Sequence, residues 1–133
     1  MKLRKKKCKV IHSPIDVKFA PDVVLQPDII VVCDLSKIDK NGGCNGAPDL
    51  VVEALSPSTQ KRDWNEKYQI YEKYGVREYW IASPSEETLT VFKLGDNGKY
   101  FLDHVYFYED KVKVGIFDDI EIDLLYVFEK YED

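Results

Sequence analysis

The chain of 133 residues is long enough for one domain with a sizeable core, and its 44% hydrophobic and 32% charged residues are ordinary for a globular protein. This composition excludes a disordered chain, and the longest apolar runs, at residues 29–33 and 50–52, are far below the roughly 20 residues of a membrane-spanning helix. Six of the 19 basic residues lie within residues 1–9, which leaves 13 basic against 24 acidic side chains in the rest. Such an acidic body argues against a protein that coats DNA with a broad basic face.

The N-terminal segment and the cysteines bear on location. No apolar core follows the basic residues 1–9, so no secretory signal is visible, and we expect a basic arm with a first strand over 1–13 and a single domain over 14–133. The arm could contact phosphates or be a solvated terminus.

Cys8, Cys33 and Cys44 cannot all pair with one another, and their spacing matches no zinc pattern. We therefore expect reduced thiols in a cytoplasmic protein.

Strands and helices are both predicted along the chain. Short runs rich in β-branched residues predict strands at 10–11, 15–19, 28–33 and 49–55, with a long turn-rich loop at 35–48. Asp63 and Glu66 form a capping-box pattern for a helix that Gly75 would end. Further strands are expected at 78–82, 88–94, 100–108 and 112–114, and a closing amphipathic helix at 121–131. The pattern is typical of an α+β domain with a central sheet.

Acidic side chains interrupt two of these apolar strands. Asp28 opens one strand directly after Pro27, and Glu53 lies inside the other. Alternation along a strand places Glu53 on the same face as Asp49 and Val51. A carboxylate in so apolar a strand is costly to bury without a partner. Glu53 is therefore expected at a sheet end near solvent, in an ion pair, or bound to a metal ion.

Lys67 is the odd residue on the helix face that should pack against the sheet. That face is formed by Trp64, Lys67, Tyr68 and Tyr71. A lysine can extend from such a position to solvent. Two strand carboxylates and an inward lysine are, however, also the components of a metal-dependent phosphodiesterase. The acids would hold a divalent cation that activates water, and the lysine would orient that water or offset developing negative charge.

Four segments of the chain resemble the Uma2 family of bacterial restriction-endonuclease-like proteins, which lies within the PD-(D/E)xK nuclease superfamily. They are LQPDIIVVCD, GAPDLVVEALSPST, RDWNEKYQIYEKYGVREYWIASP and TLTVFKL, and the resemblance extends over roughly residues 14–130. It implies an α+β fold with a four-stranded mixed central sheet flanked by helices, and Mg2+ as the metal, with Mn2+ as an alternative. It further implies Asp28 and Glu53 as the metal-binding acids. Leu55 stands where the generic motif has lysine, so the resemblance assigns that role to Lys67 on the following helix.

Further positions in or near these segments are candidates for a supporting role. They are Gln26, Asp49, Ser56 and Tyr71. Asp49 shares the strand face of Glu53, so it could support the metal site as an additional acidic group. It could equally be a turn residue that opens the strand.

Three hypotheses about function follow. The leading one is a cytoplasmic, Mg2+-dependent endonuclease that hydrolyses DNA phosphodiester bonds through catalytic Asp28, Glu53 and Lys67. The second is an inactive nuclease-fold domain that binds nucleic acid or a protein partner. The acidic body favours this second hypothesis, as does a strand region that begins sooner than in family members, which usually have helices before it. The third is a dimerisation domain with coincidental polar residues. A sheet face left uncovered by such helices would favour self-association, so we expect a homodimer and no membrane partner.

Overall fold

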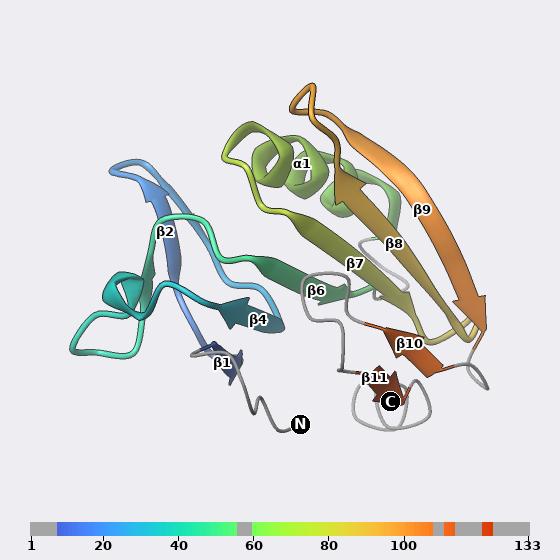
Figure 1. Ribbon diagram of the computed structural model, residues 1–133, viewed down its shortest axis with the longest axis horizontal. Coiled ribbons are helices and arrows are strands. Elements are labelled where there is room, and N and C mark those ends of the chain that lie inside the picture. The colour runs from blue at the N-terminus through green and yellow to red at the C-terminus, as the bar shows by residue number, and fades with distance from the viewer. Residues whose placement is uncertain (1–7, 56–59, 108–110, 114–120, 124–133) are drawn as a thin grey trace.

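A six-stranded mixed sheet forms the centre of the protein (Figure 1). The computed structural model describes residues 8–55, 60–107, 111–113 and 121–123. In spatial order the strands are β1 (Lys9–His12), β4 (Ile29–Val32), β6 (Leu50–Ala54), β7 (Glu78–Ser83), β8 (Thr88–Leu94) and β9 (Tyr100–Phe107). β6 and β7 are parallel, and the other neighbours are antiparallel.

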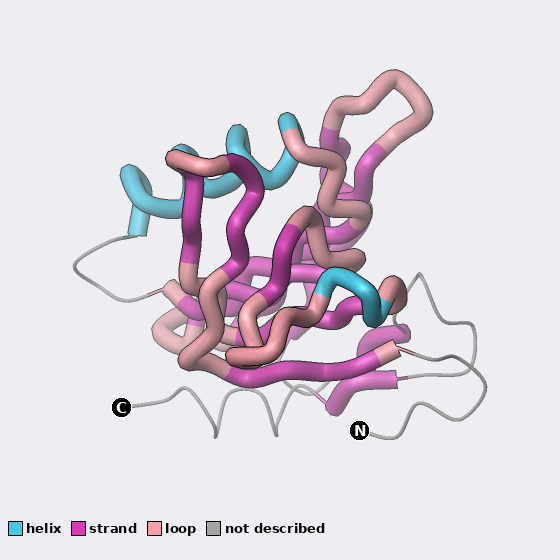
Figure 2. The backbone as a smooth tube through the Cα atoms, turned by 90° about the vertical axis from the view of Figure 1, so that its left-hand side faces the viewer, coloured by secondary structure: helices cyan, strands magenta, loops and turns pink. Residues whose placement is uncertain are grey.

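Helix α1 (Gln60–Lys73) joins the two parallel strands and lies on one face of the sheet (Figures 1 and 2). Parallel neighbours need such a crossover because the chain leaves β6 at one end of the strands and must return to the other end before β7 begins. The ring of Tyr71 packs edge-on against Tyr79 of β7, with ring centroids 5.0 Å apart. The helix begins three residues before the predicted Asp63, and Gly75 follows its end with a φ of 81°. No helix in the described residues is long and apolar enough to cross a membrane.

A smaller three-stranded sheet packs on the same face as α1. It consists of β2 (Val17–Ala20), β3 (Val23–Leu25) and β5 (Cys44–Asn45), in the order β3-β2-β5. Phe19 of β2 stacks on Tyr74, which directly follows α1, with ring centroids 5.2 Å apart, and it also contacts Tyr71 of α1 at 5.8 Å. The small sheet and the helix therefore meet through aromatic side chains above the central strands.

Both faces of the central sheet are buried at its middle strands β4, β6 and β7, whereas β9 is largely exposed. On the side of α1, one core contains Ile30, Val32, Val51, Tyr71, Tyr79 and Ile81, together with residues of the small sheet. On the opposite side, a second core contains Val31, Leu50, Val52, Trp80, Ala82, Leu89 and Val91. Because alternate residues of β4 and β6 enter different cores, these strands are continuously apolar instead of alternating with polar residues. A charged residue within them therefore stands out.

The structure corrects several predicted elements. The central sheet has six strands where the resemblance implied four, and α1 is its single flanking α-helix among the described residues. Residues 121–123 form strand β11 (Glu121–Asp123), antiparallel to β10 (Lys111–Lys113), where a closing helix was predicted; the rest of that helix lies outside the described residues. The register pairs Lys111 with Asp123 and Lys113 with Glu121, and a helical pattern takes no account of such a partner strand. The predicted loop at 35–48 contains both the 3-10 helix η1 (Leu35–Lys37) and β5.

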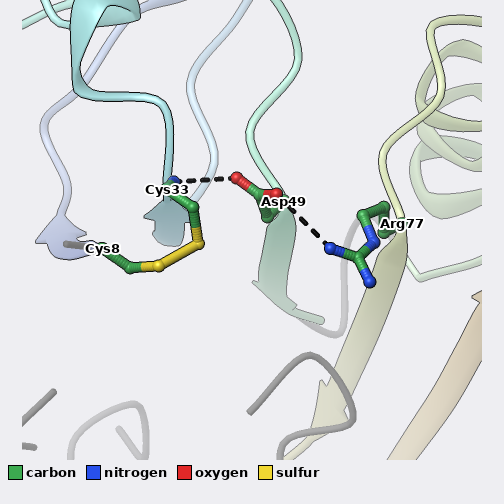
Figure 3. Close-up of a disulfide and its surroundings, with 4 residues drawn as sticks. All are labelled: Cys8, Cys33, Asp49 and Arg77. Atoms are coloured by element: carbon green, nitrogen blue, oxygen red, sulfur yellow. Dashed lines mark hydrogen bonds and ion pairs between the residues drawn. A yellow bond between two sulfur atoms is a disulfide. The ribbon is translucent and has the colours of Figure 1, made fainter. Parts of the chain in front are cut away.

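Cys8 and Cys33 form a disulfide, so the prediction of three reduced thiols is wrong (Figure 3). The antiparallel register between β1 and β4 pairs Lys9 with Val32, and one step further it places Cys8 opposite Cys33. Cys44 is free and buried. The spacing of the cysteines could not reveal this pair, because it depends on which strands are neighbours.

Reduction of this disulfide should destabilise the fold. It closes a loop with a sequence separation of 25, for which the chain-entropy model gives about 3.5 kcal/mol. We expect the free energy of unfolding, measured in urea, to fall by that order after dithiothreitol treatment. A Cys8→Ala/Cys33→Ala variant should start at the lower value and not respond to the reductant. Three reactive thiols in the untreated, denatured protein, instead of one, would contradict the pairing.

Candidate functional site

The register between β4 and β6 brings two carboxylates together. Ile29 pairs with Val52 in this antiparallel ladder, so the next position places Asp28 opposite Glu53. Residues directly opposite each other in an antiparallel pair have Cβ atoms roughly 5 Å apart on one face. Oδ2 of Asp28 accepts a hydrogen bond from the Ala54 amide at 2.7 Å. The backbone of β6 thus orients the carboxylate of Asp28 beside that of Glu53.

Glu53 meets two donors from helix α1. Its side chain lies on the face of the sheet that α1 covers, and the residue is only 4% exposed. The hydroxyl of Tyr71 donates a hydrogen bond to Oε2 of Glu53 at 2.6 Å. Nζ of Lys67 lies 3.4 Å from the same oxygen. The sheet-facing position predicted for Lys67 is confirmed, and of the environments expected for Glu53 the structure shows the ion pair.

Burial dominates the electrostatics of the site. The pKa of Glu53 is raised to about 7, chiefly by desolvation, and the nearby carboxylate of Asp28 contributes to the rise. Lys67 and the Tyr71 hydroxyl offset part of it. The pKa of Tyr71 is raised far above its ordinary value, chiefly by burial and then by Glu53. Tyr71 is therefore a protonated donor at neutral pH, whereas the raised pKa of Glu53 lies near neutrality.

Each carboxylate of the acid pair keeps one oxygen that could bind a hard cation. In the described part of the chain, Oδ1 of Asp28 and Oε1 of Glu53 accept no hydrogen bond, whereas Oδ2 and Oε2 do. Mg2+ binds through oxygen and is commonly held by one or two carboxylates together with waters and substrate phosphates. No group of three or more His, Cys, Asp or Glu side chains within the described residues could hold a metal ion. The acid pair therefore fits a cation whose coordination is completed by substrate and water.

A family model described as "Putative restriction endonuclease", Uma2, matches residues 2–124. The chain belongs to the Uma2 family. A crystal structure from Anabaena variabilis ATCC 29413, described as a "putative nuclease belonging to DUF820", superimposes with a TM-score of 0.70 at 22% identity, covering 95% of this chain and 70% of that one. The predicted restriction-endonuclease-like fold is therefore confirmed. No curated protein matches the chain.

Asp49 of this Uma2 protein lies away from the acid pair. It directly precedes β6, and the four residues to Glu53 span roughly 13 Å of extended strand. Its Oδ1 accepts a hydrogen bond from the Cys33 amide at 2.8 Å, and its Oδ2 lies 3.8 Å from Arg77 (Figure 3). Of the two interpretations left open for Asp49, the structure favours a residue that fixes the start of the strand. Asp49 and Glu53 share a face of the strand, but they lie at opposite ends of it.

The remaining supporting candidates differ in their placement. Tyr71 contacts Glu53 directly, whereas Ser56 lies outside the described residues. Gln26 is exposed two residues before Asp28, and its amide donates a hydrogen bond to Asp16 at 2.7 Å. Gln26 and Asp16 line a groove of about 300 Å³. Sequence reasoning missed Asp16 and the amide of Ala54, because neither an exposed strand-end acid nor a backbone group carries a distinguishing residue pattern.

The raised pKa of Glu53 should make the metal-free protein less stable as the pH rises. The folded state holds the Glu53 proton up to about pH 7 and the unfolded state only to about 4.5, so the folded state binds more protons in between. From this group alone, the free energy of unfolding should fall by up to about 3 kcal/mol across that window.

The variant Glu53→Gln lacks this titration. Its stability relative to wild type, measured by urea unfolding from pH 4.5 to 8, should rise with pH and level off above pH 7. Glu87→Gln, at an exposed position, serves as the control. Parallel stability profiles for Glu53→Gln and wild type would show that Glu53 titrates alike in the folded and unfolded chains.

Proposed function

We propose that this Uma2 protein is a Mg2+-dependent endonuclease that hydrolyses DNA phosphodiester bonds. The proposal depends on one observation: Asp28 and Glu53 converge from adjacent strands, and Nζ of Lys67 lies 3.4 Å from the Glu53 carboxylate. The family description and the fold support a nuclease-like function. The identity of the metal and of the nucleic acid are part of the proposal.

In such a reaction, the acid pair would bind the cation and Lys67 would act on the phosphate. The free oxygens of Asp28 and Glu53 would hold a divalent cation, which polarises a phosphoryl oxygen and lowers the pKa of a bound water. The Ala54 amide keeps Asp28 oriented toward Glu53. The side chain of Lys67 is 22% exposed, so it lies between the buried Glu53 and solvent. It can offset the negative charge that develops on the phosphate as the water attacks.

An inactive nuclease-fold domain that binds nucleic acid is the second candidate. The observation that favours it is the ion pair itself, because Lys67 compensates the charge of Glu53 without any metal ion. Cytoplasmic location and a homodimer stay predictions. The disulfide removes the argument from reduced thiols, and exposed Phe101, Leu102 and Val105 on β9 supply apolar surface for self-association.

Metal binding should depend on the acid pair. We expect calorimetric titration with Mn2+ or Mg2+, in the presence of a non-hydrolysable DNA duplex, to show binding by wild type. Asp28→Asn and Glu53→Ala should each lower the metal affinity by more than tenfold, because each removes one of two protein ligands. Asp49→Asn is the matched control, since Asp49 lies at the other end of the strand. Equal affinity in wild type and Glu53→Ala would contradict the site.

Cleavage should depend on Lys67 beyond metal binding. With plasmid DNA and saturating metal, Lys67→Ala should lower the cleavage rate by roughly 100-fold, the scale for loss of one charge-stabilising group. Lys73→Ala, on an exposed part of the same helix, should cleave like wild type. DNA binding without metal-dependent cleavage by wild type would instead establish the inactive binding domain.

A further inference from the structure

Two donors of different character share one oxygen of Glu53. The Tyr71 hydroxyl donates to Oε2 at 2.6 Å, whereas Nζ of Lys67 lies at 3.4 Å. Tyr71 is fully buried, with 0% exposure, whereas the side chain of Lys67 is 22% exposed. The shorter contact therefore comes from the more confined side chain.

The ring of Tyr71 is held from two sides. Phe19 of the small sheet lies 5.8 Å from it, centroid to centroid, and Tyr79 of the central sheet lies 5.0 Å from it. A tyrosine has two side-chain torsions, and burial between these rings restricts both. The position of the hydroxyl is consequently fixed by packing, independently of Glu53 and of Lys67.

The contact of Lys67 with Glu53 is the longer of the two. The ammonium is carried by a flexible four-carbon stem, and at 3.4 Å its contact with Glu53 is long for a charge-assisted hydrogen bond. If Lys67 moved toward a phosphate, Oε2 would retain the donor from Tyr71. A buried carboxylate that kept no donor would suffer a large desolvation penalty.

We infer that Tyr71 is a positioning residue, whose hydroxyl anchors Glu53 so that Oε1 stays available to the cation and Lys67 is released to act on the substrate. This inference rests on the proposed function. It assigns no contact between Tyr71 and substrate or cation. Its role is to hold one oxygen of Glu53 while the other oxygen and Lys67 do the chemistry.

The variant Tyr71→Phe isolates the hydroxyl, because the ring and its packing remain. Tyr74→Phe is the matched control: Tyr74 directly follows α1 and stacks on the same Phe19, and the donor to Glu53 is the hydroxyl of Tyr71. We expect Tyr71→Phe to weaken Mn2+ binding by about tenfold in calorimetry, the lower end of the effect of removing a partner of a metal ligand. Tyr74→Phe should bind Mn2+ like wild type.

A double-mutant cycle on DNA cleavage tests the release of Lys67. At saturating Mn2+, Tyr71→Phe should still cleave at least fivefold more slowly than wild type, because Lys67 is then the remaining described donor to Oε2 and stays with Glu53. In the Lys67→Ala background this rate effect should disappear, since there is no lysine left to release. The loss of Mn2+ affinity should persist there, because it acts through Glu53.

The outcomes separate the inference from the proposed function. Wild-type Mn2+ affinity in Tyr71→Phe, with loss of binding in Glu53→Ala, would overturn the inference and leave the nuclease proposal intact. An equal loss in Tyr74→Phe would overturn it as well, because the effect would then be one of packing. An additive rate effect in the Lys67→Ala background would overturn the release of Lys67. Absence of metal binding by wild type, with and without DNA, would overturn both.

Discussion

The antiparallel register between β4 and β6 is the constraint on which the candidate site depends. Because Ile29 pairs with Val52, the residue before β4 lies opposite the fourth residue of β6, and two acids 25 positions apart become neighbours. The same register directs the apolar residues of both strands into the two cores. The energy that holds the acids together is therefore mainly the hydrophobic burial of their neighbours along the strands.

The candidate site buries the carboxylate of Glu53, and burial disfavours its charged form. Glu53 lies in a strand whose neighbouring residues are almost inaccessible, and the domain supplies it with an ammonium and a hydroxyl from one helix face. These donors offset the desolvation in part, since the pKa of Glu53 remains raised. Under the proposed function, a cation bound there would take the place of the proton that burial favours on Glu53. Such a site is destabilising for the metal-free fold, as is common where function requires a buried charge.

Local patterns singled out three residues of the candidate site, the family resemblance assigned their roles, and tertiary pairing explains what the patterns missed. Asp28, Glu53 and Lys67 were each recognisable because each breaks an apolar pattern of its own strand or helix. The fate of Asp49 required knowing that one end of β6 meets Arg77, which no local pattern reveals. The disulfide, β5 and β11 likewise depend on which strand lies alongside, so short-range periodicity could not find them. Family resemblance helped most over the contiguous segment from β6 to β7, where strand, helix and strand follow each other directly.

The alternation of β6 between two cores also limits how this chain can change its length. A single-residue insertion or deletion within β6, before Val52, would turn Glu53 toward Trp80 and its apolar neighbours, and would turn Val52 toward the helix. The domain would lose its acid pair and gain an unpaired buried charge in one step. The same change within β4 would exchange the faces of its apolar residues relative to Asp28. Length changes between η1 and β5, where the backbone turns at the surface, leave that alternation untouched. Sequences descended from this one can therefore drift in loop length while the spacing inside the two central strands stays invariant.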